Sequence, residues 1–132
     1  MLIARARRRT WTHATKKLEA SGETMVAWQM LLHLIRNGQR SQTELAQLTA
    51  QHPAGVSRAL DDLEKRGRIK RRRDPQDRRR VYVVASASGK RWFAATSPVV
   101  LSAVNETLEP LSVAERRILR LLLRKVLRED VP

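Results

Sequence analysis

Cysteine is absent from this chain of 132 residues. Its absence excludes disulfide bridges, zinc ribbons, cysteine nucleophiles and thiol-based redox sensing. Aromatic residues are scarce, with three Trp, one Tyr and one Phe, so few rings are available for stacking on RNA bases. No apolar run reaches the roughly 18 residues that a membrane-spanning helix needs. The basic segment 1–9 lacks the apolar stretch of a signal peptide, which predicts a cytoplasmic protein.

Patterns for catalysis and metal binding are missing as well. The histidines His13, His33 and His52 are scattered at spacings that form no metal-ligand pattern. No glycine-rich phosphate loop occurs, and no pair of acidic residues stands in an apolar setting. The sequence therefore predicts a protein that is not an enzyme and that uses no metal or other cofactor.

The composition of the chain is dominated by positively charged residues. The chain has 27 Lys and Arg residues against 13 Asp and Glu, which gives a formal net charge of +14. Such an excess predicts a polyanionic partner, either a nucleic acid or an acidic membrane surface. The length fits one domain with a modest core, so association with a second copy would help to cover its surface.

Two short helices joined by a tight turn are predicted before the middle of the chain. A helical pattern at 25–35 precedes them. Ser41-Gln42-Thr43-Glu44 is a capping box that opens a helix over 42–49. Pro53 suits the first turn of the second helix, and Gly67 ends it. This succession is the helix-turn-helix pattern.

A β-hairpin, or wing, is predicted next. Residues 69–73 and 80–85 have the pattern of strands, and the segment 74–79 between them is turn-forming. A long helix should follow from Ser86 to about residue 108, and Pro98 inside it should kink or break it. The predicted fold class is thus mostly α with a small β-hairpin (α+β), a winged helix-turn-helix.

The last helix is predicted to carry a subunit interface. Ser112 and Glu115 form a second capping box, which opens a helix that runs to about residue 128. Its apolar residues cover more than the one stripe that a surface helix needs. The surplus predicts a second buried face, most simply against another copy of the chain.

Ten of the 27 basic residues fall within 65–80, in and beside the predicted wing. A charge run is ordinarily a solvated surface, but this one borders a helix-turn-helix, so we expect it to contact phosphates and a DNA groove. Arg suits phosphate and narrow-groove contacts better than Lys does. The ten are Lys65, Arg66, Arg68, Lys70, Arg71, Arg72, Arg73, Arg78, Arg79 and Arg80.

The helix at 53–66 is the expected recognition helix, whose first residues meet base edges in the major groove. Arg58 can bond a guanine edge at two points. The alternative is that Arg58 only pairs with Asp61 or Asp62 on the helix surface. The predicted DNA contacts are Ser41, Gln42, Thr43, Pro53, Ala54, Gly55, Ser57, Arg58, Arg71, Arg73, Asp77, Arg78 and Arg79.

Residues 25–89 resemble the DNA-binding core of the MarR family of winged helix-turn-helix regulators. The matching stretches are Glu44-Leu45-Ala46, residues 56–67 and residues 74–79. The last is the most specific, because wings of that family typically carry Asp-x-Arg at the tip. Residues 85–89, Ala-Ser-Ala-Ser-Gly, depart at two positions from the Leu-Thr-x-x-Gly of the family, but the serine still suits a helix cap.

The resemblance implies roles for individual residues. Arg79 matches the arginine that enters the minor groove, Asp77 the acid that holds it, and Arg58 a frequent recognition-helix contact. Family members are typically homodimers joined by their terminal helices. We therefore expect a single domain with a DNA-binding core at 23–89 and dimerisation helices at 1–22 and 90–132.

The expected function is that of a homodimeric, sequence-specific regulator, a repressor, on a pseudo-palindromic site in double-stranded DNA. Many family members are released by small aromatic or lipophilic ligands, and Trp11, Trp28 and His33 are candidates to line such a site, although each is more often a core or interface residue. The alternatives from the charge alone are a non-specific architectural or RNA-binding protein, and a protein drawn to membrane surfaces by its basic N-terminus.

Overall fold

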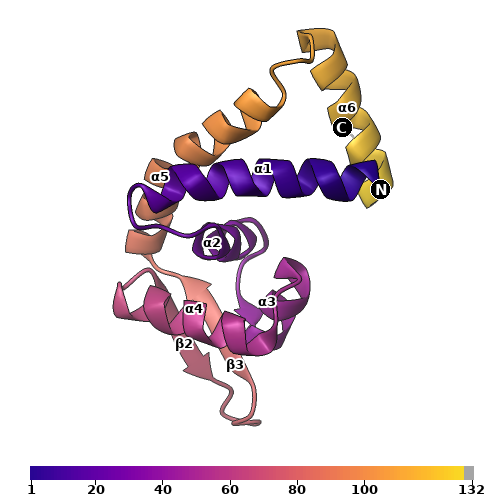
Figure 1. Ribbon diagram of the computed structural model, residues 1–132. Coiled ribbons are helices and arrows are strands. Elements are labelled where there is room, and N and C mark those ends of the chain that lie inside the picture. Colours follow the sequence, from indigo (N-terminus) through magenta and orange to yellow (C-terminus); the bar gives the residue numbers. More distant parts are fainter. Residues whose placement is uncertain (130–132) are drawn as a thin grey trace.

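Helices make up most of the chain in the computed structural model, which describes residues 1–129 (Figure 1). The mostly helical winged fold that the sequence predicts is confirmed. No helix in the described part is long and apolar enough to cross a bilayer. The elements are α1 (Leu2–Glu19), α2 (Met25–Asn37), β1 (Arg40–Ser41), α3 (Gln42–Thr49), α4 (Pro53–Lys65), β2 (Ile69–Arg73), β3 (Val81–Ala85), α5 (Ala87–Thr107) and α6 (Val113–Leu127).

Hydroxyl side chains cap the starts of four helices. In each case a hydroxyl accepts a hydrogen bond from the backbone N–H three residues later, which satisfies one of the donors that a helix start leaves open. In α6 the capping box is complete, because the Glu115 carboxylate also accepts from the Ser112 N–H at 2.7 Å. The four capping residues are Thr24, Ser41, Ser86 and Ser112.

The sheet has a third strand that the sequence does not predict. Its order is β1-β3-β2, and both pairings are antiparallel. β1 has only two residues, which is too short for an alternating pattern to be visible in the sequence. The strand pairs Ser41 with Tyr82 and so places the start of α3 directly beside the wing.

Two buried clusters hold the helices in place. One joins α2, α3 and α4 to β2 and β3, and the other joins α1 to α2 and α5. The first fixes the helix-turn-helix on the sheet, and the second fixes the long terminal helices on that core. Central members of the first are Met30, Leu31, Leu45, Leu60 and Val83, and the second consists of Ala14, Leu18, Met25, Val100 and Ala103.

α5 runs through Pro98 without a break, so of the predicted kink or break the break is wrong. A proline inside a helix costs stability because it removes one hydrogen bond and crowds the carbonyl four residues earlier. Pro98 is exposed, and Ala94, which carries that carbonyl, is exposed too. Water can therefore satisfy the carbonyl, and the helix continues.

α6 turns back from the far end of α5 and buries none of its residues (Figure 1). Arg116 fixes the turn, since its Nε donates to the carbonyls of Leu108 at 3.1 Å and Leu111 at 3.2 Å. Residues 130–132 of the predicted dimerisation segment 90–132 lie outside the described residues. Large apolar side chains of α6 are 41–77% exposed, namely Val113, Ile118, Leu121, Leu122, Leu123, Val126 and Leu127.

Candidate nucleic-acid interface

α4 has the two-sided character that a recognition helix needs. Val56, Leu60 and Leu63 recur at helical spacing and are fully buried, which seats one side of the helix on the core. The start of the helix points outward, with Pro53, Ala54 and Arg58 exposed and Gly55 and Ser57 half-buried.

The arginine on this exposed face has no acidic partner. Asp62 pairs with Arg66, at 3.0 Å between Oδ2 and Nε, and Asp61 pairs with Arg71. Within residues 1–129, no ion pair involves Arg58. The alternative in which Arg58 is neutralised by its helix neighbours is therefore not realised, and its guanidinium is available for an external acceptor.

Arg71 departs from the expectation of a DNA contact. Its side chain turns back to α4, where it pairs with Asp61 and with Glu64 at 3.2 Å, and only 19% of it is exposed. The hydrogen bond with Glu64 is the largest cause that raises the pKa of Arg71, so the charge is firmly held. Arg71 thus anchors the wing to the recognition helix, and we no longer expect it to contact DNA.

At the tip of the wing Asp77 pairs with Arg79, as the resemblance implies. Asp77 Oδ1 accepts from the backbone N–H of Arg79 at 3.1 Å and lies 3.4 Å from its Nε. The Arg79 side chain remains 94% exposed. Arg73 donates to the backbone carbonyl of Arg78 at 2.9 Å and so braces the hairpin. The geometry leaves the side chains of Arg78 and Arg79 at the surface, and their DNA contacts stay a prediction.

Ser41 is a second departure. It is only 5% exposed, and its hydroxyl accepts from the Glu44 N–H at 3.1 Å as the cap of α3. We therefore assign Ser41 a structural role in place of the expected DNA contact. The neighbouring Gln42 is half-buried and Thr43 is exposed, so both remain accessible from outside.

Two cavities bring the predicted contact residues together from separate elements. One, of about 660 Å³, lies between the start of α3 and the base of the wing. The other, of about 450 Å³, lies between α4 and β2. The predicted contacts Gln42, Thr43, Pro53 and Arg79 share the first, and Gln42, Ser57, Arg71 and Arg73 share the second. The helix-turn-helix and the wing therefore form one continuous surface.

Arg72 and Arg80 belong to the basic run expected to contact phosphates but not to the individually predicted DNA contacts; both are exposed and line these cavities. The alternation of side chains in β2 could have predicted the exposure of Arg72. Side chains alternate along a strand, so the buried Ile69 predicts that Arg71 turns inward and Arg72 outward. No pattern predicts the cap of α4, where His52 Nδ1 accepts from a backbone N–H at 3.2 Å, because histidine is not a favoured N-cap residue.

The three candidate ligand-lining residues have separate surroundings. Trp28 stacks on Phe93 at 5.4 Å between ring centroids, and its Nε1 donates to Ser97 at 3.0 Å. Trp11 packs against the same buried cluster as Trp28, which joins α1 to α5. His33 is half-buried outside that cluster, and burial lowers its pKa. The structure thus brings the two tryptophans together as packing residues and leaves His33 apart.

Sequence comparisons identify relatives of this architecture. The MarR family model matches residues 21–80. The transcriptional regulator HosA of Escherichia coli O111:H- is 33% identical over 86 residues, which are 65% of this chain and 64% of HosA. The match therefore spans slightly less than two thirds of the length of that curated relative.

Solved structures extend the likeness to nearly the whole chain. BpsR of Bordetella bronchiseptica, whose DNA binding is regulated by 6-hydroxynicotinic acid, is 27% identical with a TM-score of 0.80, over 95% of both chains. A probable transcriptional regulator from Pseudomonas aeruginosa is 30% identical with a TM-score of 0.75, over 95% of this chain and 93% of the other. These relatives are regulators and not enzymes, in agreement with the expectation. Over residues 21–80 the chain is similar to the MarR family, and over nearly its whole length it is similar to a probable transcriptional regulator.

Proposed function

We propose that the protein is a homodimeric regulator that binds specific sites in double-stranded DNA and represses transcription in the cytoplasm. The observation that carries this proposal is the exposed Arg58 at the start of α4. Its acidic neighbours Asp61 and Asp62 are already paired with other arginines. An unpaired arginine on a recognition helix is suited to the N7 and O6 acceptors of guanine.

The wing supplies the second part of the proposed grip. Arg79 enters the minor groove while Asp77 orients it, and the remaining exposed arginines of the wing bind phosphates. Phosphate contacts position the protein and supply affinity that falls with salt, whereas base contacts select the sequence. Specificity thus rests mainly on α4 and affinity mainly on the wing.

The dimer is proposed from the unpartnered apolar surface at the ends of the chain. The large apolar residues of α6 are exposed, and so are Met1, Leu2 and Ile3 at the start of α1. A second copy would bury both regions. We assign residues 1–22 and 90–132 to dimerisation and 23–89 to DNA binding. Two-fold symmetry then predicts a pseudo-palindrome with half-sites about 34–36 Å apart.

Selection of binding sites from random duplex DNA tests the proposed function. The expected result is enrichment of a palindromic motif whose half-sites lie about one helical turn apart. If no motif is enriched while binding persists, the protein is a non-specific nucleic-acid binder and the proposal is wrong. The variant Arg58→Ala should enrich a degenerate motif at the positions that α4 reads.

A small aromatic acid is proposed as the effector. The support comes from BpsR, the relative whose DNA binding 6-hydroxynicotinic acid regulates. The selected site, bound to the wild-type protein, should be titrated with 6-hydroxynicotinic acid and with related phenolic acids. Release of the DNA by one of these acids supports the effector, and unchanged binding in all titrations argues against it.

A further inference from the structure

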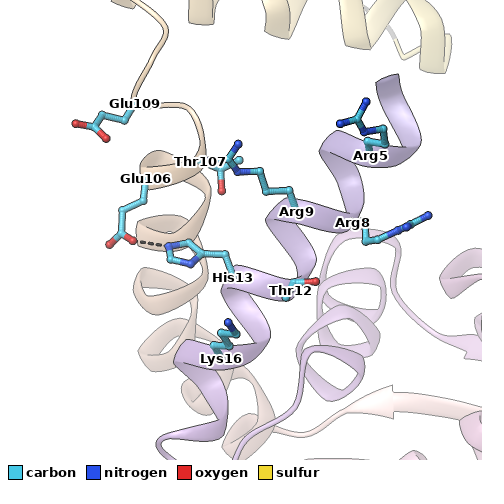
Figure 2. Close-up of a pocket in the computed structure, with 9 residues that line it drawn as sticks. All are labelled: Arg5, Arg8, Arg9, Thr12, His13, Lys16, Glu106, Thr107 and Glu109. Carbon is cyan, nitrogen blue, oxygen red and sulfur yellow. Dashed lines mark hydrogen bonds and ion pairs between the residues drawn. The ribbon is translucent and has the colours of Figure 1, made fainter. Parts of the chain in front are cut away.

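Several acidic side chains of this basic chain are held by basic residues from other elements. Figure 2 shows one case, in which Glu106 of α5 is bonded to His13 of α1. Both residues lie in the segments assigned to dimerisation, where a second copy is proposed to pack. Another case lies in the DNA-binding core, where Asp61 and Glu64 of α4 pair with Arg71 of β2. This group joins the recognition helix to the wing.

The three residues form the outermost polar link between α4 and the wing. The guanidinium of Arg71 contacts Asp61 through Nη2, and it donates to Glu64 from Nε at 3.3 Å and from Nη2 at 3.2 Å. Within residues 1–129, no hydrogen bond or ion pair joins residues 72–81 to α4. Beyond Arg71, the wing therefore has no polar attachment to the recognition helix.

The position of the wing tip depends on this link. Ile69 is buried in the core and fixes the base of β2, and Arg71 is the next residue on the same side of the strand. The hydrogen bonds of the segment 73–80 that follows stay within the hairpin. A tilt of β2 at Arg71 would therefore displace Arg79, the proposed minor-groove contact, relative to the start of α4.

Charge alone makes Asp61 and Glu64 unfavourable for DNA binding. Their side chains are 53% and 44% exposed. Glu64 lines the cavity between α4 and β2 together with Ser57 and Arg72, which are expected to meet DNA. Carboxylates in this place repel phosphates, because like charges brought together cost free energy. A role in holding Arg71 accounts for two acidic residues on this helix.

We propose that Asp61 and Glu64 are positioning residues for DNA binding, which hold the wing at the angle to α4 at which both reach the same DNA. The inference rests on the proposed function. The two carboxylates touch no DNA and act through Arg71. A guanidinium that pairs through several of its N–H groups is fixed in direction as well as in distance, so the pairing sets the orientation of β2.

Fluorescence anisotropy of the full chain with a labelled duplex that carries the selected motif tests the proposal. Asp61→Asn/Glu64→Gln removes two negative charges, which by charge alone would tighten binding. We expect the opposite, a loss of affinity of about tenfold, because the wing is no longer held. Asp62→Asn is the control, since Asp62 pairs at 3.0 Å with Arg66 of the same helix end and not with the wing. This control should bind the duplex as tightly as wild type or more tightly.

A second comparison separates positioning from a loss of folding. Arg79→Ala should weaken binding by the wild type, and it should do so clearly less in the Asp61→Asn/Glu64→Gln background, where the wing is already displaced. Thermal unfolding checks that every variant is folded at the temperature of the assay. The proposal is overturned if Asp61→Asn/Glu64→Gln binds as tightly as Asp62→Asn does, or if Arg79→Ala costs the same affinity in both backgrounds.

The same titrations with a random-sequence duplex keep this inference apart from the proposed function. Phosphate contacts of the wing do not depend on the motif, so the loss in Asp61→Asn/Glu64→Gln should appear there too. If the wild type binds the random duplex but no motif is enriched, the proposed function is wrong and the variants decide this inference on the random duplex. If the wild type binds neither duplex, both are wrong.

Discussion

Arg68 forms a two-point ion pair with Glu23, at 2.9 Å for both nitrogen–oxygen contacts. The same guanidinium lies 4.2 Å from the ring centroid of Trp92. Glu23 lies in the loop before α2, Arg68 directly precedes β2, and Trp92 lies in the first turns of α5. Only 14% of the Arg68 side chain and 15% of the Glu23 side chain are exposed, so water screens the pair little. The pair therefore ties the base of the wing to the long helices.

Removal of either partner should destabilise the protein. Glu23→Gln and Arg68→Gln should each cost about 1.5–3 kcal/mol of unfolding free energy in urea denaturation, because each leaves a shielded charge without its partner. The double variant should cost clearly less than the sum of the two. Arg66 provides the control, because its Nη1 lies 3.8 Å from Glu23 Oε2. Arg66→Gln should lower the free energy of unfolding by less than Arg68→Gln does. If the losses of unfolding free energy in the two single variants add up to that of the double variant, Glu23 and Arg68 do not stabilise each other.

Gly89 should not tolerate a methyl group. A Cβ there would lie 1.9 Å from the backbone oxygen of Arg68, so α5 would have to move away from the base of the wing. Gly89→Ala should lower the melting temperature, with a loss of about 1–3 kcal/mol. Gly55 in α4 has open space around it, and Gly55→Ala should raise stability by about 0.5–1 kcal/mol. Equal effects of the two substitutions would contradict the tight contact at Gly89.

Much of this architecture was predictable from local signals. Serine caps, proline at the first turn of α4 and apolar spacing act within a few residues, so the bounds of α3 and β2 agree with prediction to the residue. Contacts between distant segments were not predictable. Arg71 belongs to an arginine run, and only the fold brings it beside Asp61 and Glu64. The ion pair of Arg68 likewise depends on a carboxylate 45 positions away.

Glu106 should make stability depend on acid pH. Its contacts with Lys17, then His13, lower its pKa from 4.5 to about 2. A carboxyl whose pKa is depressed by folding stabilises the folded state above its unfolded pKa and loses that contribution as pH falls. The difference in unfolding free energy between wild type and Glu106→Gln should therefore be full above pH 4.5 and shrink toward pH 2. Glu109→Gln is the control, and a difference independent of pH would contradict the assignment.

Arg58 and Arg79 should differ in what their removal does to DNA binding. Arg58→Ala should cost about 1–3 kcal/mol on the selected site and little on random DNA, because it removes a base contact. Arg79→Ala should weaken binding to many sequences and flatten the dependence of affinity on salt. Fluorescence anisotropy on both DNAs over a salt series measures each effect. An unchanged salt slope for Arg79→Ala would exclude the proposed contact of the wing.

α6 should control the oligomeric state. Leu122 is 54% exposed in the single chain, and a second copy would bury it. Leu122→Glu should therefore shift the protein from dimer to monomer in sedimentation velocity, because an unpaired charge at a buried interface costs about 3–5 kcal/mol. Leu48 on α3 is 44% exposed and lies outside the proposed interface, so Leu48→Glu should remain dimeric. If Leu122→Glu remains a dimer, the second copy does not bury this part of α6, and the interface lies elsewhere.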